Sequence, residues 1–186
     1  MNLVRAIVLV ALLPSLPFSS ILAVQRSHET PEEVARHYLA AMAAGDWHGM
    51  TVLMHPVAMH ETRQALSPLF DSQSPDSLRE QLLGVRSVGD ARSLSDTALC
   101  EAFLRQLSRQ GRLGDILHNS KSQVIGHVDG GRDTTYVVYR MTYQDGDASI
   151  SRLDVFAMRR MGQTWRGLLN INLSVLSRNL RRVTGT

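Results

Sequence analysis

The character of this chain changes near Ser122, and that change most restricts the folds open to it. Apolar residues recur at helical spacing before this point, whereas four later stretches are rich in β-branched and aromatic residues: SQVIGHV, TTYVVYRMTY, SISRLDVFAMRR and TWRGLLNINL. Turn-forming residues separate the four stretches, at Asp129-Gly130-Gly131, Gln144-Asp145-Gly146-Asp147 and Met161-Gly162-Gln163. Short turns join antiparallel neighbours, so the sequence predicts N-terminal helices followed by an antiparallel meander, an α+β domain.

Capping residues divide the helical half. Thr30 begins a first helix, with proline at the next position and Glu33 placed to close a capping box. Gly45 is placed to end that helix, and Asp46 is placed to cap a short second one. Pro56 can start a third helix, and residues 57–110 continue with helical patterns.

The single cysteine is predicted to be buried and unreactive. An exported chain with one cysteine forms no internal disulfide. Cys100 lies in a helix that Ser95 or Asp96 would cap, and it shares one face with apolar neighbours: Leu99, Phe103, Leu104 and Leu107. It is therefore expected to act as a small core hydrophobe rather than a nucleophile.

The N-terminus has the pattern of a secretory signal. Arg5 precedes an apolar run from Ala6 to Leu13, which is shorter than the roughly 20 residues that span a bilayer. Cleavage is expected after Ala23, and an uncleaved membrane anchor is the alternative. The predicted organisation is a signal peptide over 1–23, one α+β domain over 28–175 and a basic tail over 176–186. The expected location is secreted or periplasmic.

The cations of the chain do not form a nucleic-acid site. The formal charge is +3, and Lys121 is the only lysine among arginines scattered along the sequence. A nucleic-acid-binding protein would gather such residues into a stripe. The scatter is typical of a solvated surface, and no nucleic-acid partner is expected.

Two segments give a family resemblance. The stretch YLAAMAAGDWHGMTVLMHP resembles the opening helices of the nuclear-transport-factor-2-like superfamily, and VFAMRRMGQTWRGLLNINL resembles its final hairpin. This resemblance implies a curved sheet that wraps helices into a cone with an interior for a small apolar ligand. The helical pattern of residues 57–110 departs from the family, which usually places strands there.

Strand alternation predicts which side chains face that interior. The better lining set has two tyrosines and no carboxylate or histidine, which argues against proton transfer by residues of the sheet. With one helical residue, the predicted pocket lining is Trp47, Val137, Tyr139, Met141, Tyr143, Leu153, Val155, Trp165 and Leu169.

The opposite sheet face mixes apolar and charged groups. Cross-strand ion pairs on a solvated face are one interpretation. The other is a homodimer through this face, because its apolar side chains form a larger patch than a monomer usually exposes. The predicted interface consists of Tyr136, Val138, Arg140, Asp154, Phe156, Met158 and Leu168.

Catalytic candidates come from the helices instead. They are Asp46, His55, His60 and Glu61, with Tyr139 or Tyr143 as hydrogen-bond donors. No HExxH motif forms around His60, and His37, His118 and His127 lie in separate elements, so neither a metal nor another cofactor is predicted.

The sequence therefore predicts an exported, non-catalytic module that binds a small apolar ligand or a protein partner. A small isomerase-like or dehydratase-like enzyme, acting on an apolar substrate in the cone, is the first alternative. A scaffold subunit of an envelope assembly, with its N-terminal segment retained in the membrane, is the second.

Overall fold

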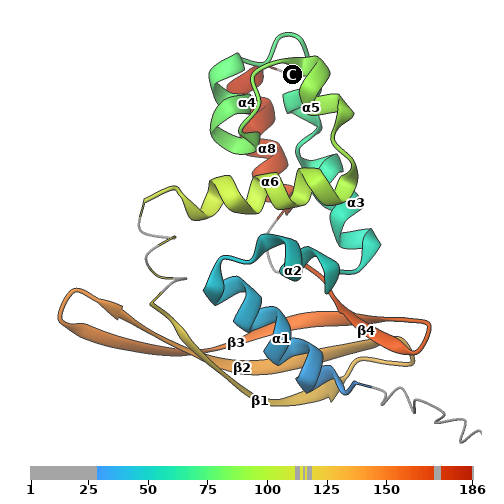
Figure 1. Cartoon of the computed structure of the whole chain (residues 1–186), viewed down its shortest axis with the longest axis vertical. Helices are drawn as coiled ribbons and strands as arrows, with labels where there is room; N and C mark the ends of the chain where they lie inside the picture. The colour runs from blue at the N-terminus through green and yellow to red at the C-terminus, as the bar shows by residue number, and fades with distance from the viewer. Residues whose placement is uncertain (1–28, 112–113, 115, 117–118, 170–172, 186) are drawn as a thin grey trace, which may run out of the picture.

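The structure is a computed structural model that describes residues 29–111, 114, 116, 119–169 and 173–185. Its helices and strands are drawn in Figure 1. The helical elements are α1 (Pro31–Ala44), α2 (Trp47–Val52), α3 (Pro56–Ala65), the 3-10 turn η1 (Ser67–Phe70), α4 (Asp76–Leu83), α5 (Val88–Ser93), α6 (Asp96–Ser108) and α8 (Leu173–Thr184). The strands are β1 (Lys121–Asp129), β2 (Thr134–Asp145), β3 (Ala148–Met161) and β4 (Thr164–Gly167).

The four strands form one antiparallel sheet in the order β1-β2-β3-β4, so the predicted α+β fold and meander are confirmed. The last strand is shorter than predicted and ends at Gly167. Gly167 donates its N–H to the Leu53 carbonyl, 2.9 Å away, and accepts from the N–H of His55 at 2.8 Å. The backbone of β4 therefore bonds to the junction of α2 and α3, which ties the helices to the edge of the sheet.

The predicted helix caps are present. The Thr30 side chain and the Glu33 side chain each accept from the other residue's backbone N–H, which is a complete capping box. Gly45 ends α1 with φ 68°, a left-handed conformation that favours glycine. Asp46 accepts from the Gly49 N–H at 2.8 Å and so caps α2. Ser95 caps α6 by accepting from the N–H of Ala98.

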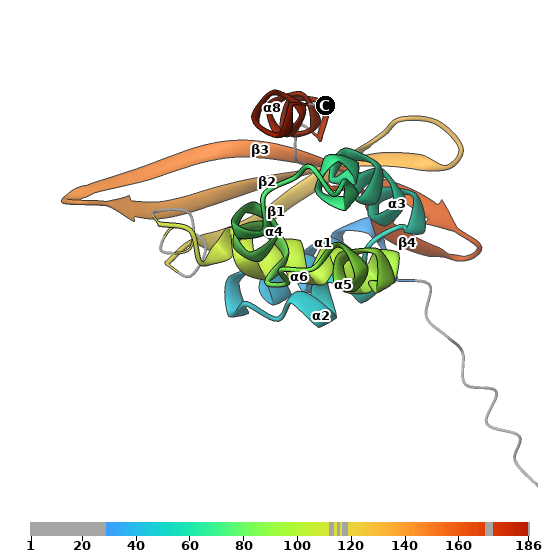
Figure 2. The same ribbon diagram turned by 90° about the horizontal axis from the view of Figure 1, so that it is seen from above.

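One face of the sheet is covered by helices, and we call it the inner face. Helix α1 runs along it, with α2 and α6 lying above α1 (Figures 1 and 2). Apolar side chains from these helices and from the inner face form the main core, which consists of Val34, Ala35, Tyr38, Leu39, Trp47, Met50, Met54, Ala58, Cys100, Leu104, Val137, Tyr139, Met141, Phe156, Met158 and Trp165.

Helix α6 also builds a second core. Cys100 and Leu104 point into the main core, whereas Leu99 and Phe103 belong to a separate cluster formed with η1, α4, α5 and α8. This second core consists of Leu66, Leu69, Leu83, Ala91, Leu99, Phe103 and Leu180. Cys100 is fully buried and burial raises its pKa to about 11, so its predicted role as a core hydrophobe agrees with the structure.

The C-terminal segment differs from the predicted basic tail. Residues 176–184 lie within α8, and Leu180 is buried in the second core. The arginines that predicted a tail are the exposed face of an amphipathic helix. The predicted signal peptide lies outside the described residues. Among those residues, no helix has the length and apolar character needed to cross a membrane.

Arg79 organises the lobe around the second core. Its side chain is only 2% exposed, and it donates to the main-chain oxygens of Arg86 (2.7 Å), Ser74 (2.7 Å) and Asp71 (3.1 Å). It also pairs with the carboxylate of Asp76. The fixed fork of a guanidinium can reach these separate acceptors at once, which a lysine ammonium cannot match in the same geometry.

Replacing Arg79 should therefore destabilise the protein strongly. Arg79→Met leaves one buried and two partly buried carbonyls without this donor, and we expect the free energy of unfolding to fall by about 3 kcal/mol. Urea denaturation measures the change. Arg86→Met is the matched control, because Arg86 pairs with Glu80 on the surface and its loss should change stability by less than about 1 kcal/mol. Similar losses in both variants would contradict the role given to Arg79.

A histidine–carboxylate pair joins α1 to the sheet. The Nδ1 atom of His127 in β1 lies 2.5 Å from the Glu32 carboxylate in α1. The hydrogen bond to Glu32 raises the pKa of His127, with the charges of Glu32 and Asp129 acting in the same direction. Protonated His127 therefore stabilises the fold.

This pair predicts a pH dependence. Because the pKa of His127 is raised on folding, its stabilisation is complete below about pH 6.5, the ordinary histidine value, and is lost as the pH rises through the raised pKa. We expect the Tm to fall by about one or two degrees more in the wild type than in His127→Gln between about pH 6 and 8.5. His37→Gln is the control, since His37 is exposed, and it should keep the wild-type profile. A wild-type profile in His127→Gln would refute the prediction.

Candidate ligand pocket

The register of β2 and β3 decides which side chains face the helices. Asp145 pairs with Ala148 across a two-residue turn, so each odd-numbered residue of β2 faces an even-numbered residue of β3. Tyr139 lies opposite Asp154, and Val137 lies opposite Phe156. The inner face of β3 therefore carries the even-numbered residues.

This register corrects the predicted parity of β3. Leu153 and Val155, predicted to line the pocket, are 62% and 43% exposed on the other face. Asp154, Phe156 and Met158, predicted to belong to the interface, lie on the inner face, and Phe156 and Met158 are buried in the main core. A shift of one residue in pairing moves every side chain of a strand to the other face.

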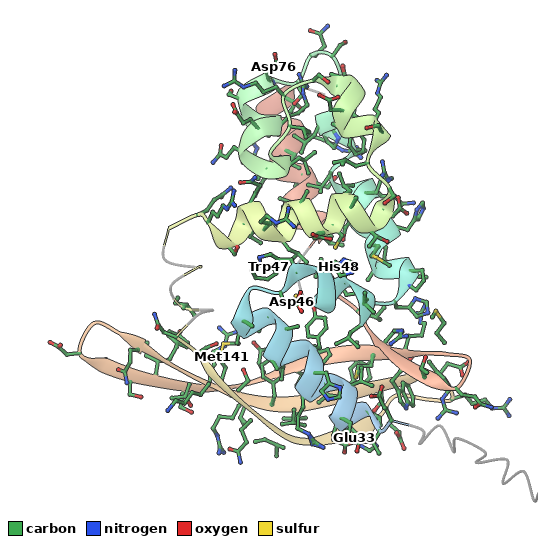
Figure 3. All side chains as sticks on the ribbon, viewed as in Figure 1. Glu33, Asp46, Trp47, His48, Asp76 and Met141 are labelled. Atoms are coloured by element: carbon green, nitrogen blue, oxygen red, sulfur yellow. The ribbon has the colours of Figure 1, made fainter. Side chains whose placement is uncertain are left out.

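A cavity of about 480 Å³ lies between the inner face and helices α1, α2 and α6. In Figure 3, Met141 rises from the sheet and Trp47 comes from α2 above it. Most of the lining is apolar, and among the described residues of the wall the charged side chains are Arg152 and Asp154. The lining consists of Tyr38, Leu39, Met42, Trp47, Met50, Leu104, Leu107, Ser108, Ile116, Tyr139, Met141, Tyr143, Arg152, Asp154, Phe156 and Leu169.

The predicted lining residues divide into three groups. Those on the cavity wall are Trp47, Tyr139, Met141, Tyr143 and Leu169. Val137 and Trp165 are buried in the main core without reaching the cavity. Leu153 and Val155 face away. The residues of α1 and α6 on the wall were not predicted, because their apolar spacing marks a core-facing helix but does not show where packing leaves space.

Polarity increases along β3 towards one end of the cavity. Phe156 is 3% exposed, the Asp154 side chain is 22% exposed and the Arg152 side chain is 58% exposed. Arg152 pairs with the Asp154 carboxylate, which also accepts from the N–H of Val155 at 2.9 Å. The hydrogen bond to Asp154 raises the pKa of Arg152. The cavity thus has an apolar interior and a charged rim.

Tyr38 supplies a polar atom in the apolar part. Its ring stacks on Phe156 with centroids 5.2 Å apart, and burial raises the pKa of its hydroxyl far above the ordinary value. Within the described residues, its hydroxyl forms no hydrogen bond. A neutral tyrosine hydroxyl in this position can donate to a carbonyl or hydroxyl group of a bound molecule.

The four catalytic candidates lie away from the cavity wall. Asp46 caps α2, and the Nδ1 atom of His55 accepts from the N–H of Val57 at 3.2 Å as the cap of α3. Burial, and then the charge of Arg159, lower the pKa of His55. His60 lies 3.3 Å from the Asp96 carboxylate on the surface, and Glu61 is exposed. The structure brings none of them together with Tyr139 or Tyr143.

The histidines named for a metal site are also separated where they are described. His37 lies beside Glu29, His127 lies beside Glu32, and His118 lies outside the described residues. No group of three histidine, cysteine or carboxylate side chains in the described part of the chain is arranged to hold a metal ion.

Comparison of the chain with protein-family profiles, curated proteins and solved structures found no match.

Proposed function

We propose that the chain is an exported domain of the nuclear-transport-factor-2-like type that binds a small apolar molecule in the cavity between its helices and its sheet. The cavity carries this proposal, since its volume of about 480 Å³ falls in the usual range of ligand sites, roughly 300 to 1,000 Å³. The secretory pattern of the first 23 residues supports export.

The lining supports an elongated ligand with limited polarity. Methionine, leucine and aromatic side chains cover most of the wall, and methionine adapts to irregular ligand shapes. Tyr38 offers one hydrogen bond in the interior, and Arg152 with Asp154 meets the end of the ligand at the rim. The ligand is therefore an apolar molecule with one buried oxygen and a polar group at the opposite end.

The neutral dye Nile red tests binding in the cavity. We expect the protein recovered after export to bind it, and Met141→Trp to bind at least about tenfold more weakly because indole fills part of the space. Val183→Trp is the control, since Val183 is 65% exposed on α8, and it should bind as the wild type does. Unchanged binding in Met141→Trp would place the dye elsewhere and oppose the proposal.

A second candidate function is proton-transfer catalysis by Asp154. The register gives the cavity a carboxylate that sequence parity did not place there, directly opposite Tyr139. However, Arg152 and the Val155 N–H already donate to that carboxylate, so a substrate proton would have to compete with both bonds. This arrangement favours binding over catalysis.

Hydrogen–deuterium exchange separates these two functions. The binding proposal predicts that the protein does not accelerate exchange at the activated carbon of an apolar ketone such as 2-tetralone in deuterated buffer, as followed by NMR. Acceleration that disappears in Asp154→Asn but persists in Asp46→Asn would instead support the enzyme, because Asp46 only caps α2.

A further inference from the structure

The face of the sheet opposite the cavity, which we call the outer face, carries exposed hydrophobic side chains. The described helices lie on the other side of the sheet (Figure 1). Leu153 and Val128 are 62% and 61% exposed, and a β-bulge between Val124 and Gly126 leaves Ile125 exposed as well. The exposed hydrophobic residues of this face are Ile125, Val128, Tyr136, Leu153, Val155 and Met161.

Strand pairing joins most of these residues into one patch. Val128 of β1 lies opposite Tyr136 of β2, and Val138 of β2 lies opposite Val155 of β3. Leu153 is the next residue on the same face of β3, two positions from Val155. A contiguous apolar surface of this kind marks a site of interaction with a protein or a membrane.

The charged residues that the register assigns to the outer face are all cations: Lys121, Arg140, Arg159 and Arg166. They lie towards both ends of the apolar patch. Arg159 and Arg166 pair with each other beyond Tyr136, at the end near the β3–β4 turn. At the other end Arg140 lies opposite Leu153, and Lys121 lies in the next row of the same face.

The carboxylates of the sheet lie elsewhere. Asp154 faces the cavity, and Asp129 lies on the inner face beside His127. Asp133 lies in the turn after β1, where the preceding residue is the cation of Arg132. The other acids of the sheet belong to the tip of the β2–β3 hairpin, at residues 145–147, beyond the patch.

The cations of the outer face are therefore uncompensated. Within the described residues, none of the four forms an ion pair. Arg140 instead donates to the neutral amide oxygen of Gln123 at 3.5 Å. Arg159 and Arg166 are direct cross-strand neighbours, and like charges in such a position are unfavourable unless an anion lies between them.

We propose that the outer face binds the surface of an anionic lipid membrane. Its apolar side chains enter the boundary between head groups and acyl chains, and its cations meet the lipid phosphates. The Arg159–Arg166 pair gains most from this arrangement, because a phosphate relieves its repulsion. Strands β2 and β3 are paired on both sides, so their backbone groups are already satisfied when the face approaches the apolar region.

The charge pattern favours a lipid surface over a second copy of the chain. The homodimer predicted from the sequence would bring four cations of one copy towards four of the other. Of its predicted interface, Tyr136, Val138 and Arg140 do lie on the outer face, whereas partly buried Leu168 packs against the main core. Neither Leu153 nor the cations of the outer face line the cavity, so the proposal does not depend on the cavity ligand.

Co-sedimentation with vesicles tests the proposal, with the protein recovered after export. We expect binding to vesicles of three parts phosphatidylcholine to one part phosphatidylglycerol, and at least about tenfold weaker binding to phosphatidylcholine alone. Leu153→Asp should weaken binding at least about tenfold, because it places a carboxylate in the apolar patch. Arg159→Gln and Arg166→Gln should each weaken it by about fivefold. Circular dichroism checks that each variant folds.

Matched controls come from α8, the other basic and partly apolar surface. Val183→Asp makes the same change as Leu153→Asp at a 65% exposed residue, and Arg181→Gln removes an exposed cation of α8. Both should bind as the wild type does. The proposal is overturned by equal binding to the two kinds of vesicle, or by variants of α8 that lose binding while those of the outer face keep it. A dimer in sedimentation velocity that Leu153→Asp dissociates, without vesicle binding, also overturns it and assigns the face to a second copy.

Discussion

The fold depends on helix α6, because this one helix is shared by two cores. Cys100 and Leu104 pack in the main core with the sheet. Leu99 and Phe103, each one residue earlier, pack in the second core with η1, α4, α5 and α8. Adjacent residues of a helix point about 100° apart, so two such stripes require apolar groups over a wide arc. The helix thereby fixes the elements of the second core relative to the sheet, and it forms one wall of the cavity.

The second constraint is the two-residue turn between β2 and β3. Because Asp145 pairs with Ala148, the numbers of paired residues differ in parity along the whole hairpin. This pairing places Asp154 and Phe156 on the face towards the helices, and Leu153 and Val155 on the face away from them. The charged rim of the cavity and the exposed apolar residues on the other face of β3 therefore follow from the same register. The wrong parity of β3 accordingly misplaced residues in both the predicted pocket lining and the predicted interface.

Local chemistry explains which parts of the structure could be predicted from the sequence. The capping box at Thr30, the glycine that ends α1 and the turn residues between strands each act within a few positions, so their patterns determined the helices and the meander. Which residues of two strands share a face depends on the number of residues in the loop between the strands. The segment Gln144 to Asp147 allows more than one loop length, so the face of Asp154 could not be read from strand pattern alone.

The catalytic candidates lie away from the cavity for a related reason. Asp46 and His55 were selected because polar residues cluster at the junction of α1, α2 and α3, but helix ends attract such residues to satisfy their unpaired backbone N–H groups. Both side chains are held at helix ends by these bonds, and neither lies on the cavity wall. Asp154 caps no helix, and its carboxylate pairs with Arg152 of the inner face and accepts from the N–H of Val155. Asp154 is therefore the polar group best placed to meet a ligand, and the register of β2 and β3 is what shows that it faces the cavity.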